Sequence, residues 1–151
     1  PRYKQGIDMA SPPLTSREYA YLKITGEGSF LVISEALGLE PTNAWNKGDI
    51  NRKNGRLRNL TSWQLESGLD DRCSIDEHLN ALVLLLEPVE KKLYQLSSQY
   101  DICVQCVGYF PPASHGINID NKMVRFASRI GGSIDFDFYF VDDFGHDLDF
   151  V

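Results

Sequence analysis

The chain has 151 residues, of which 42% are hydrophobic and 24% charged, and its formal net charge is −6 at pH 7. This balance is typical of one globular domain with a core of its own, and it excludes a disordered chain. The longest apolar run falls far short of the roughly 20 residues that a membrane span needs. Because no basic leader with an apolar segment opens the sequence, we expect no export. Because the three cysteines are odd in number, we expect a cytoplasmic protein with reduced thiols.

The first part of the chain is predicted to form one strand and one helix before a long loop. Residues 1–16 lack periodicity and are expected to form a flexible N-terminal arm. Alternating apolar and polar residues from Arg17 to Thr25 predict a strand. Ser29 is a suitable N-cap for a helix that runs to Leu37, where a glycine follows. Residues 39–60 have no clean period, so we expect an ordered loop, with or without a short hairpin.

The second part begins with a predicted strand from Thr61 to Glu66. Ser74 and Glu77 then match the S-x-x-E capping box at the start of an apolar stripe of helical spacing. Pro88 lies within this stripe, and we expect it to divide the segment into helices over 74–87 and 89–99. The remaining elements are expected to be a strand, a helix and a strand, at residues 101–110, 120–130 and 133–141.

The last predicted strand alternates strictly, so its two faces differ in chemistry. Its apolar side is expected to face the core and consists of Ile134, Phe136, Phe138 and Phe140. The opposite side is expected to meet solvent or a partner.

Strands that alternate with helices exclude an all-α bundle and an all-β sandwich. We expect an α+β fold over residues 17–141, a two-layer sandwich in which helices cover one face of a four-stranded, mostly antiparallel sheet. Residues 142–151 are expected to form an acidic C-terminal tail.

The order of short motifs resembles a known bacterial family. Leu37-Gly38-Leu39-Glu40-Pro41-Thr42 is followed by Trp45 and Lys47-Gly48, and the chain later contains Trp63 and Ile134-Asp135-Phe136-Asp137-Phe138-Tyr139. This order resembles the family known as domain of unknown function 4279, over about Glu18 to Tyr139. The resemblance implies a compact α+β domain of the bacterial cytosol, and it implies no reaction.

Charge is unevenly distributed along the chain. The first 60 residues carry nine Lys and Arg against six Asp and Glu, whereas the remainder carry six against fifteen. Clustered carboxylates can steer a basic partner, while interleaved aromatic residues supply affinity. We interpret a cluster at the C-terminal end of the chain, here called the acidic face, as the surface by which an immunity-type protein neutralises a basic toxin, such as a nuclease, through protein–protein binding. Its residues are Asp135, Asp137, Tyr139, Asp142, Asp143, Phe144 and Asp147. The plainer alternative is a solvated strand face and a solvated tail.

A second hypothesis places function in the basic loop, Trp45 to Arg58. A nucleotide or RNA could stack on the tryptophan while cations hold its phosphates; the residues concerned are Trp45, Lys47, Arg52, Arg56 and Arg58. The net negative charge makes nucleic acid a less favoured partner than a basic protein. An enzyme with its pocket in this loop is a third and weaker interpretation. The alternative is that the two tryptophans are core residues, and this alternative is stronger for Trp63 than for Trp45.

No catalytic motif with a supporting spacing is present, so we expect no enzymatic activity, no cofactor and no specific metal site. Cys103 and Cys106 form a CxxC within a predicted strand, which favours two structural thiols over a redox or zinc site. His78 lies in the first turn of the capped helix and is expected to be exposed.

Overall fold

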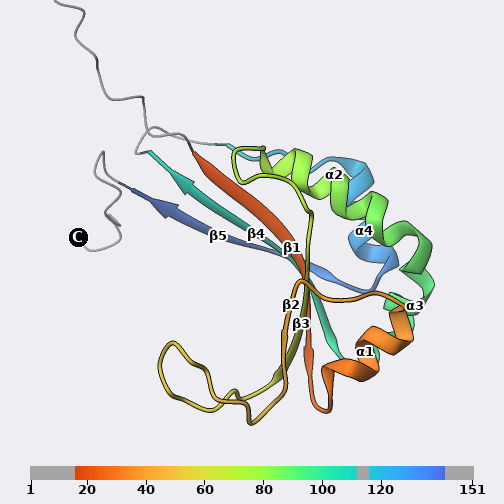
Figure 1. The fold of residues 1–151 in the computed structure, drawn as a ribbon. Coiled ribbons are helices and arrows are strands. Elements are labelled where there is room, and N and C mark those ends of the chain that lie inside the picture. Colours follow the sequence, from red (N-terminus) through yellow and green to blue (C-terminus); the bar gives the residue numbers. More distant parts are fainter. Residues whose placement is uncertain (1–15, 112–115, 142–151) are drawn as a thin grey trace, which may run out of the picture.

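The computed structural model describes residues 16–111 and 116–141. In chain order the elements are β1 (Arg17–Gly26), α1 (Phe30–Leu37), β2 (Asn43–Trp45), β3 (Thr61–Glu66), α2 (Ile75–Leu86), the 3-10 turn η1 (Glu87–Val89), α3 (Glu90–Leu96), β4 (Asp101–Phe110), α4 (Asn121–Arg129) and β5 (Ser133–Phe140). The strands form one sheet, and the helices lie together on one side of it (Figure 1). The fold is therefore α+β with two layers, as predicted.

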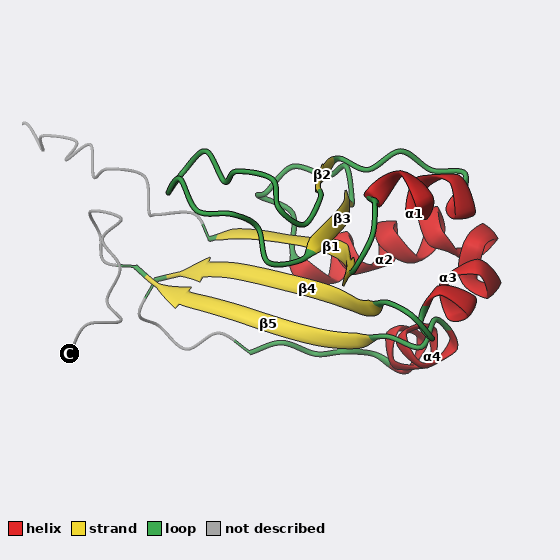
Figure 2. Cartoon of the chain, turned by 90° about the horizontal axis from the view of Figure 1, so that it is seen from below, coloured by secondary structure: helices red, strands yellow, loops and turns green. Residues whose placement is uncertain are grey.

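The sheet has five strands in the order β2-β3-β1-β4-β5, so the prediction of four strands was wrong. The missed strand, β2, has only three residues and pairs with β3 inside the segment expected to be a loop. The first three pairings are antiparallel, whereas β4 and β5 run parallel, as Figure 2 shows. A parallel pair needs a long crossover connection, and α4 lies within it.

The predicted helix starts and breaks that depend on local side-chain chemistry are present, although α3 ends at Leu96 rather than at residue 99 as predicted. Ser29 accepts a hydrogen bond from the Leu31 N–H, and Gly38 ends α1 in the left-handed conformation, with φ of 67°. The capping box of Ser74 and Glu77 is present in both directions. The predicted break at Pro88 is the turn η1, which separates α2 from α3.

The core lies between the helices and one face of the sheet. Alternate residues of β1 and β4 point into it, including Leu22, Ile24 and Val104, all fully buried. Trp63 of β3 is also fully buried, and its indole Nε1 donates to Ser34 Oγ of α1 at 2.9 Å. Among the described helices, none has the length and apolarity to span a bilayer.

Both cysteines of the CxxC are buried, on opposite faces of β4, and neither is in a disulfide. Burial raises the pKa of the Cys106 thiol to about 12, because the thiolate would be poorly solvated there. Such a thiol is unreactive at neutral pH. The prediction of two structural thiols is consistent with this burial.

We therefore expect only Cys73, which is partly exposed, to react rapidly with a thiol reagent such as Ellman's reagent in the folded protein. Cys103 and Cys106 should react only after unfolding in guanidinium. The Cys73→Ser variant provides the control, since it should show no fast phase. Rapid modification of the folded Cys73→Ser variant would contradict a structural role for the CxxC.

Candidate functional site

The helices leave one side of the sheet uncovered in the described part of the chain (Figure 1). This side, the open face, carries the outward residues of β1, β4 and β5. Four tyrosines lie on it: Tyr19, Tyr21, Tyr109 and Tyr139. The rings of Tyr109 and Tyr139, which are register partners across β4 and β5, stack with centroids 4.9 Å apart. The open face is thus an aromatic surface built on paired strands.

Arg17 extends this aromatic surface at the start of β1. Its guanidinium lies 5.3 Å from the centroid of Tyr19 and 5.6 Å from that of Tyr109. Arg17 Nε also donates to Asp71 Oδ2 at 2.6 Å, and this hydrogen bond raises the pKa of the arginine further. The guanidinium is therefore held over the rings by a carboxylate.

Three side chains form a hydrogen-bond chain across the open face. Lys23 Nζ donates to Gln105 Oε1 at 3.2 Å, and Gln105 Nε2 donates to Asp137 Oδ2 at 3.0 Å. Gln105 is only 2% exposed, since the neighbouring side chains cover it. Burial, with the nearby Tyr19 and Asp137, raises the pKa of Tyr21 to about 12. The centre of the open face is thus ordered before any partner binds.

The predicted acidic face is placed in part by the structure. Asp135, Asp137 and Tyr139 share one side of β5, as the alternation predicted. Asp135 is exposed, and its Oδ1 accepts a hydrogen bond from the Phe136 backbone N–H. The remaining four predicted residues lie outside the described part of the chain: Asp142, Asp143, Phe144 and Asp147.

The other side of β5 is less buried than the sequence predicted. Ile134 and Phe138 pack against the core, but Phe136 and Phe140 are 39% and 38% exposed. β5 is an outer strand of the sheet, so only one neighbouring strand screens these rings. All four apolar residues lie on the core side of β5 as predicted, but the expectation that this side is buried was wrong for these two phenylalanines.

The basic loop is an ordered excursion on the same side of the sheet as the open face (Figure 1). Its two limbs are joined by backbone hydrogen bonds of 2.8 Å, from Gly48 N to Arg58 O, from Arg58 N to Asp49 O and from Asn51 N to Arg56 O. Ile50 and Leu57 form an isolated antiparallel bridge between the limbs. The loop is therefore hairpin-like, one of the two forms expected.

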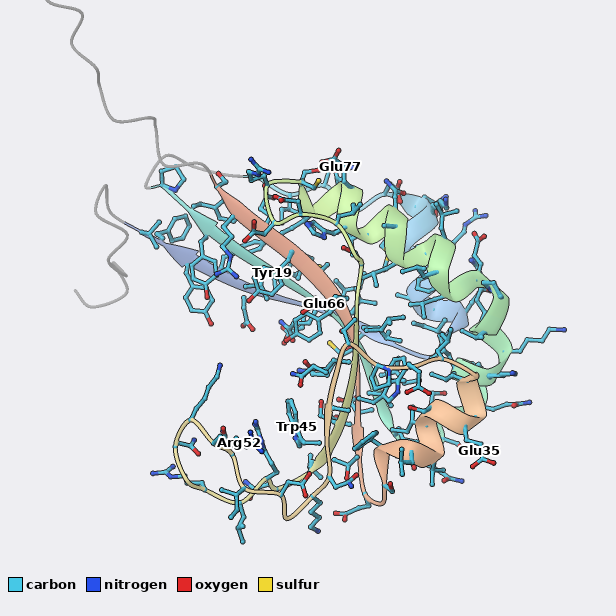
Figure 3. All side chains as sticks on the ribbon, viewed as in Figure 1. Tyr19, Glu35, Trp45, Arg52, Glu66 and Glu77 are labelled. Carbon is cyan, nitrogen blue, oxygen red and sulfur yellow. The ribbon has the colours of Figure 1, made fainter. Side chains whose placement is uncertain are left out.

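The structure brings together three of the five residues proposed in the basic loop. The Arg58 guanidinium lies 3.9 Å from the centroid of the Trp45 ring, and Trp45 Nε1 donates to Leu60 O at 3.2 Å. Trp45, Arg52 and Arg58 line one groove of about 1070 Å³, and Figure 3 shows Trp45 and Arg52 on the same side of the sheet. Lys47 instead pairs with Glu27 at 2.9 Å, and Arg56 does not line the groove.

The two predicted surfaces remain separate in the described residues. The ion pairs found there are Arg17–Asp71, Lys47–Glu27, Arg72–Asp70 and Arg129–Glu90, and none joins the basic loop to β5. Among the described residues, the basic loop therefore does not neutralise Asp135 or Asp137 of β5. Within residues 16–111 and 116–141, no three His, Cys, Asp or Glu side chains are grouped to hold a metal ion.

His78 was expected to be exposed, but it is buried, with an exposed fraction of 1%. Its Nδ1 lies 2.5 Å from Ser67 Oγ, and its Nε2 has no hydrogen-bond partner among the described residues. His78 lines a cavity of about 370 Å³ with Arg17 and Tyr19. The signal in the sequence was its place at i+3 from buried Ile75, within the apolar stripe of α2.

Comparison with known proteins adds a family. The family model described as Domain of unknown function (DUF4279) matches residues 16–141, which span all the helices and strands described above. Comparisons with curated proteins and with solved structures gave no match. The family description names no activity, so the function has to be argued from the geometry.

Proposed function

We propose that this chain, which belongs to the DUF4279 family, is a binding protein that engages a basic protein partner through its open face, as an immunity-type protein neutralises a toxin. One observation carries the proposal. Asp135 and Asp137 lie beside the stacked Tyr109–Tyr139 pair on a sheet face that the described helices leave uncovered.

The residue types on this face are those that dominate protein interfaces. Tyrosine and arginine supply much of the binding energy at interfaces, because each combines a large apolar surface with a polar group. Tyr19 and Tyr109 are already held by Arg17, and Asp137 by Gln105. Side chains that are ordered before binding lose less conformational entropy in the complex. The open face therefore has both the residue types and the preformed order that favour tight binding of a protein partner.

The aspartates supply selectivity for a basic partner. Carboxylates that flank an aromatic patch attract a positively charged surface and raise its association rate. A nuclease toxin must carry such a surface, because it binds phosphates. By covering that surface, this chain would inhibit the toxin without catalysing any reaction. We place the chain in the cytoplasm, together with the toxin.

The test uses the double variant Asp135→Asn/Asp137→Asn, in which each amide keeps the shape of the carboxylate. The matched control is Glu35→Gln/Glu87→Gln, which removes two exposed carboxylates from the helical layer. Each tagged protein serves as bait in an extract of the native host at low salt. We expect the wild type and the control to retain one stoichiometric basic protein that raised salt releases.

The retained protein is then purified, and its association rate is measured by surface plasmon resonance. We expect the double aspartate variant to associate about tenfold more slowly at low salt, with a smaller difference at high salt. The retained protein should also inhibit growth when expressed alone, and co-expression of this chain should relieve the inhibition. Equal rates for the two double variants, or a partner that is not toxic, would contradict the proposal.

A further inference from the structure

The groove beside Trp45 is lined by residues that the proposed function does not use. The groove has a volume of about 1070 Å³ and is lined by Asn43, Ala44, Trp45, Asp49, Ile50, Asn51, Arg52, Lys53 and Arg58. We propose that it binds a nucleoside phosphate, with the base stacked on the Trp45–Arg58 pair and the phosphate held by Arg52 and Lys53.

The stacking surface is fixed in position before a ligand arrives. The hydrogen bond from Trp45 Nε1 to Leu60 O sets the indole plane, and the Arg58 guanidinium lies 3.9 Å from the ring centroid. Nucleobases stack both on aromatic rings and on guanidinium planes. The pair therefore offers a planar surface of positive charge, which suits a base that carries a phosphate.

The charge of the groove favours an anion. Three cations line it, and Asp49 is the one carboxylate among its lining residues. Asp49 Oδ2 already accepts a hydrogen bond from the Asn46 backbone N–H. None of Arg52, Lys53 and Arg58 forms an ion pair with a described carboxylate. The cations are thus available for phosphate oxygens.

Two amides supply hydrogen-bonding groups for the edge of a base. Asn43 Nδ2 donates to Gln64 Oε1 at 3.2 Å, which leaves the Asn43 carbonyl oxygen as an acceptor. Asn51 Oδ1 accepts from the Lys53 backbone N–H at 3.1 Å, which leaves the Asn51 amide nitrogen as a donor. The groove therefore presents both hydrogen-bond acceptors and hydrogen-bond donors beside the stacking surface.

The backbone bonds between the limbs of the basic loop keep these groups in place. Gly48 and Gly55 adopt positive φ of 88° and 70°, which lets the chain turn within the loop. A preformed pocket avoids the entropy cost of ordering a loop on binding. Its volume of about 1070 Å³ is slightly above the roughly 300–1000 Å³ of small-molecule sites. A free nucleotide or one unit of a single-stranded RNA has the chemistry to occupy it.

The intrinsic tryptophan fluorescence tests the proposal, because the chain has two tryptophans and Trp63 is fully buried in the core. Quenching by a ligand in solution therefore reports on Trp45. The probes are AMP, ATP and an eight-nucleotide oligoadenylate RNA, at about 50 mM salt to limit screening. Polyglutamate is the control for an anion that has no base. We expect quenching by at least one of the nucleotide probes and none by polyglutamate.

Calorimetry with the same probes then assigns the residues. We expect Arg52→Ala/Lys53→Ala and Trp45→Ala each to weaken binding by about tenfold or more, and Trp45→Phe to retain most of it. The matched control Lys91→Ala/Lys92→Ala removes two exposed cations from α3 and should bind as the wild type does. Circular dichroism of each variant checks its fold.

The outcomes separate the two sources of the ligand. Binding of AMP or ATP as tight as that of the oligonucleotide supports a free nucleotide, and binding of the oligonucleotide alone supports single-stranded RNA. Polyglutamate binding equal to that of the nucleotides would overturn the proposal in favour of an acidic peptide. So would unchanged affinity in Arg52→Ala/Lys53→Ala, or no binding of any nucleotide probe. These results leave the acidic-face proposal untouched, because Asp135 and Asp137 do not line the groove.

Discussion

Replacing Gly108 by alanine is expected to lower the free energy of unfolding by about 2 kcal/mol, because the new methyl group overpacks a filled site. A Cβ at this position of β4 would lie 2.4 Å from two ring atoms of Phe110 and 3.3 Å from Phe138 Cδ1. Phe110 is fully buried and meets Phe138 edge-on, with centroids 5.4 Å apart, so moving its ring would disturb this packing. Urea unfolding followed by circular dichroism measures the change.

Gly116→Ala is the matched control, since a Cβ there has no heavy atom of the described residues within 4 Å. It should stabilise the protein slightly, by up to about 1 kcal/mol, because alanine lowers the entropy of the unfolded chain. Adding Phe110→Leu to Gly108→Ala should recover part of the loss, because the two sites are in contact. Equal stability of the two alanine variants would show that the Phe110 ring can move aside.

The Gly108 contact also bears on the open face. Gly108 is the register partner of Phe138, and the adjacent partners are Tyr109 with Tyr139. The close fit of the Phe110 ring against β4 therefore helps to hold β5 where its outward side chains form the candidate binding surface. A glycine that packs an aromatic ring on the core face thus contributes to the order of the opposite face.

The sequence predicted those parts of the fold that depend on neighbours along the chain. The cap at Ser29, the capping box at Ser74 and the break at Pro88 each need only residues within four positions, and all three are present. The strand β2 and the parallel pairing of β5 were not predictable in this way. β2 exists because Asn43, Ala44 and Trp45 pair with a strand about 20 residues further along the chain.

The burial of side chains was likewise predictable only where it depends on neighbours along the chain. Alternation in β5 correctly separated Asp135 and Asp137 from the phenylalanines, because side chains of a strand must point to opposite faces. It could not predict how far the helical layer extends over an edge strand, so Phe136 and Phe140 are more exposed than expected. His78 differs in the opposite direction: it is polar and was expected to be exposed, but it is buried because it lies within the apolar stripe of α2.

The sequence predicted which residues belong to the candidate sites, but not how their side chains lie relative to one another. Five basic or aromatic residues of the basic loop were proposed together, and three of them line one groove. Lys47 is turned away by its ion pair with Glu27, a residue 20 positions earlier in the chain. Such pairings are set by the tertiary fold, which composition and local charge cannot reveal.

Trp63→Ala is expected to cause the largest loss of stability, about 3–5 kcal/mol, since truncating a buried aromatic residue leaves a cavity and removes its apolar contacts. Trp63 is fully buried between β3 and the helical layer, as the sequence indicated more strongly for this tryptophan than for Trp45. At this chain length each kcal/mol corresponds to about 2–4 °C in Tm. The thermal midpoint should therefore fall by roughly 6–20 °C.

The hydrogen bond from Trp63 Nε1 to Ser34 Oγ lets a double-mutant cycle separate packing from polar pairing. Ser34→Ala alone should cost about 1–2 kcal/mol, because it leaves a buried indole N–H without a partner. In the Trp63→Ala background the same change should cost under about 0.5 kcal/mol, since no N–H remains to be satisfied. Urea unfolding of the four proteins measures the coupling. Equal costs of Ser34→Ala in the two backgrounds would mean that the bond contributes nothing to stability and that Trp63 acts through its volume alone.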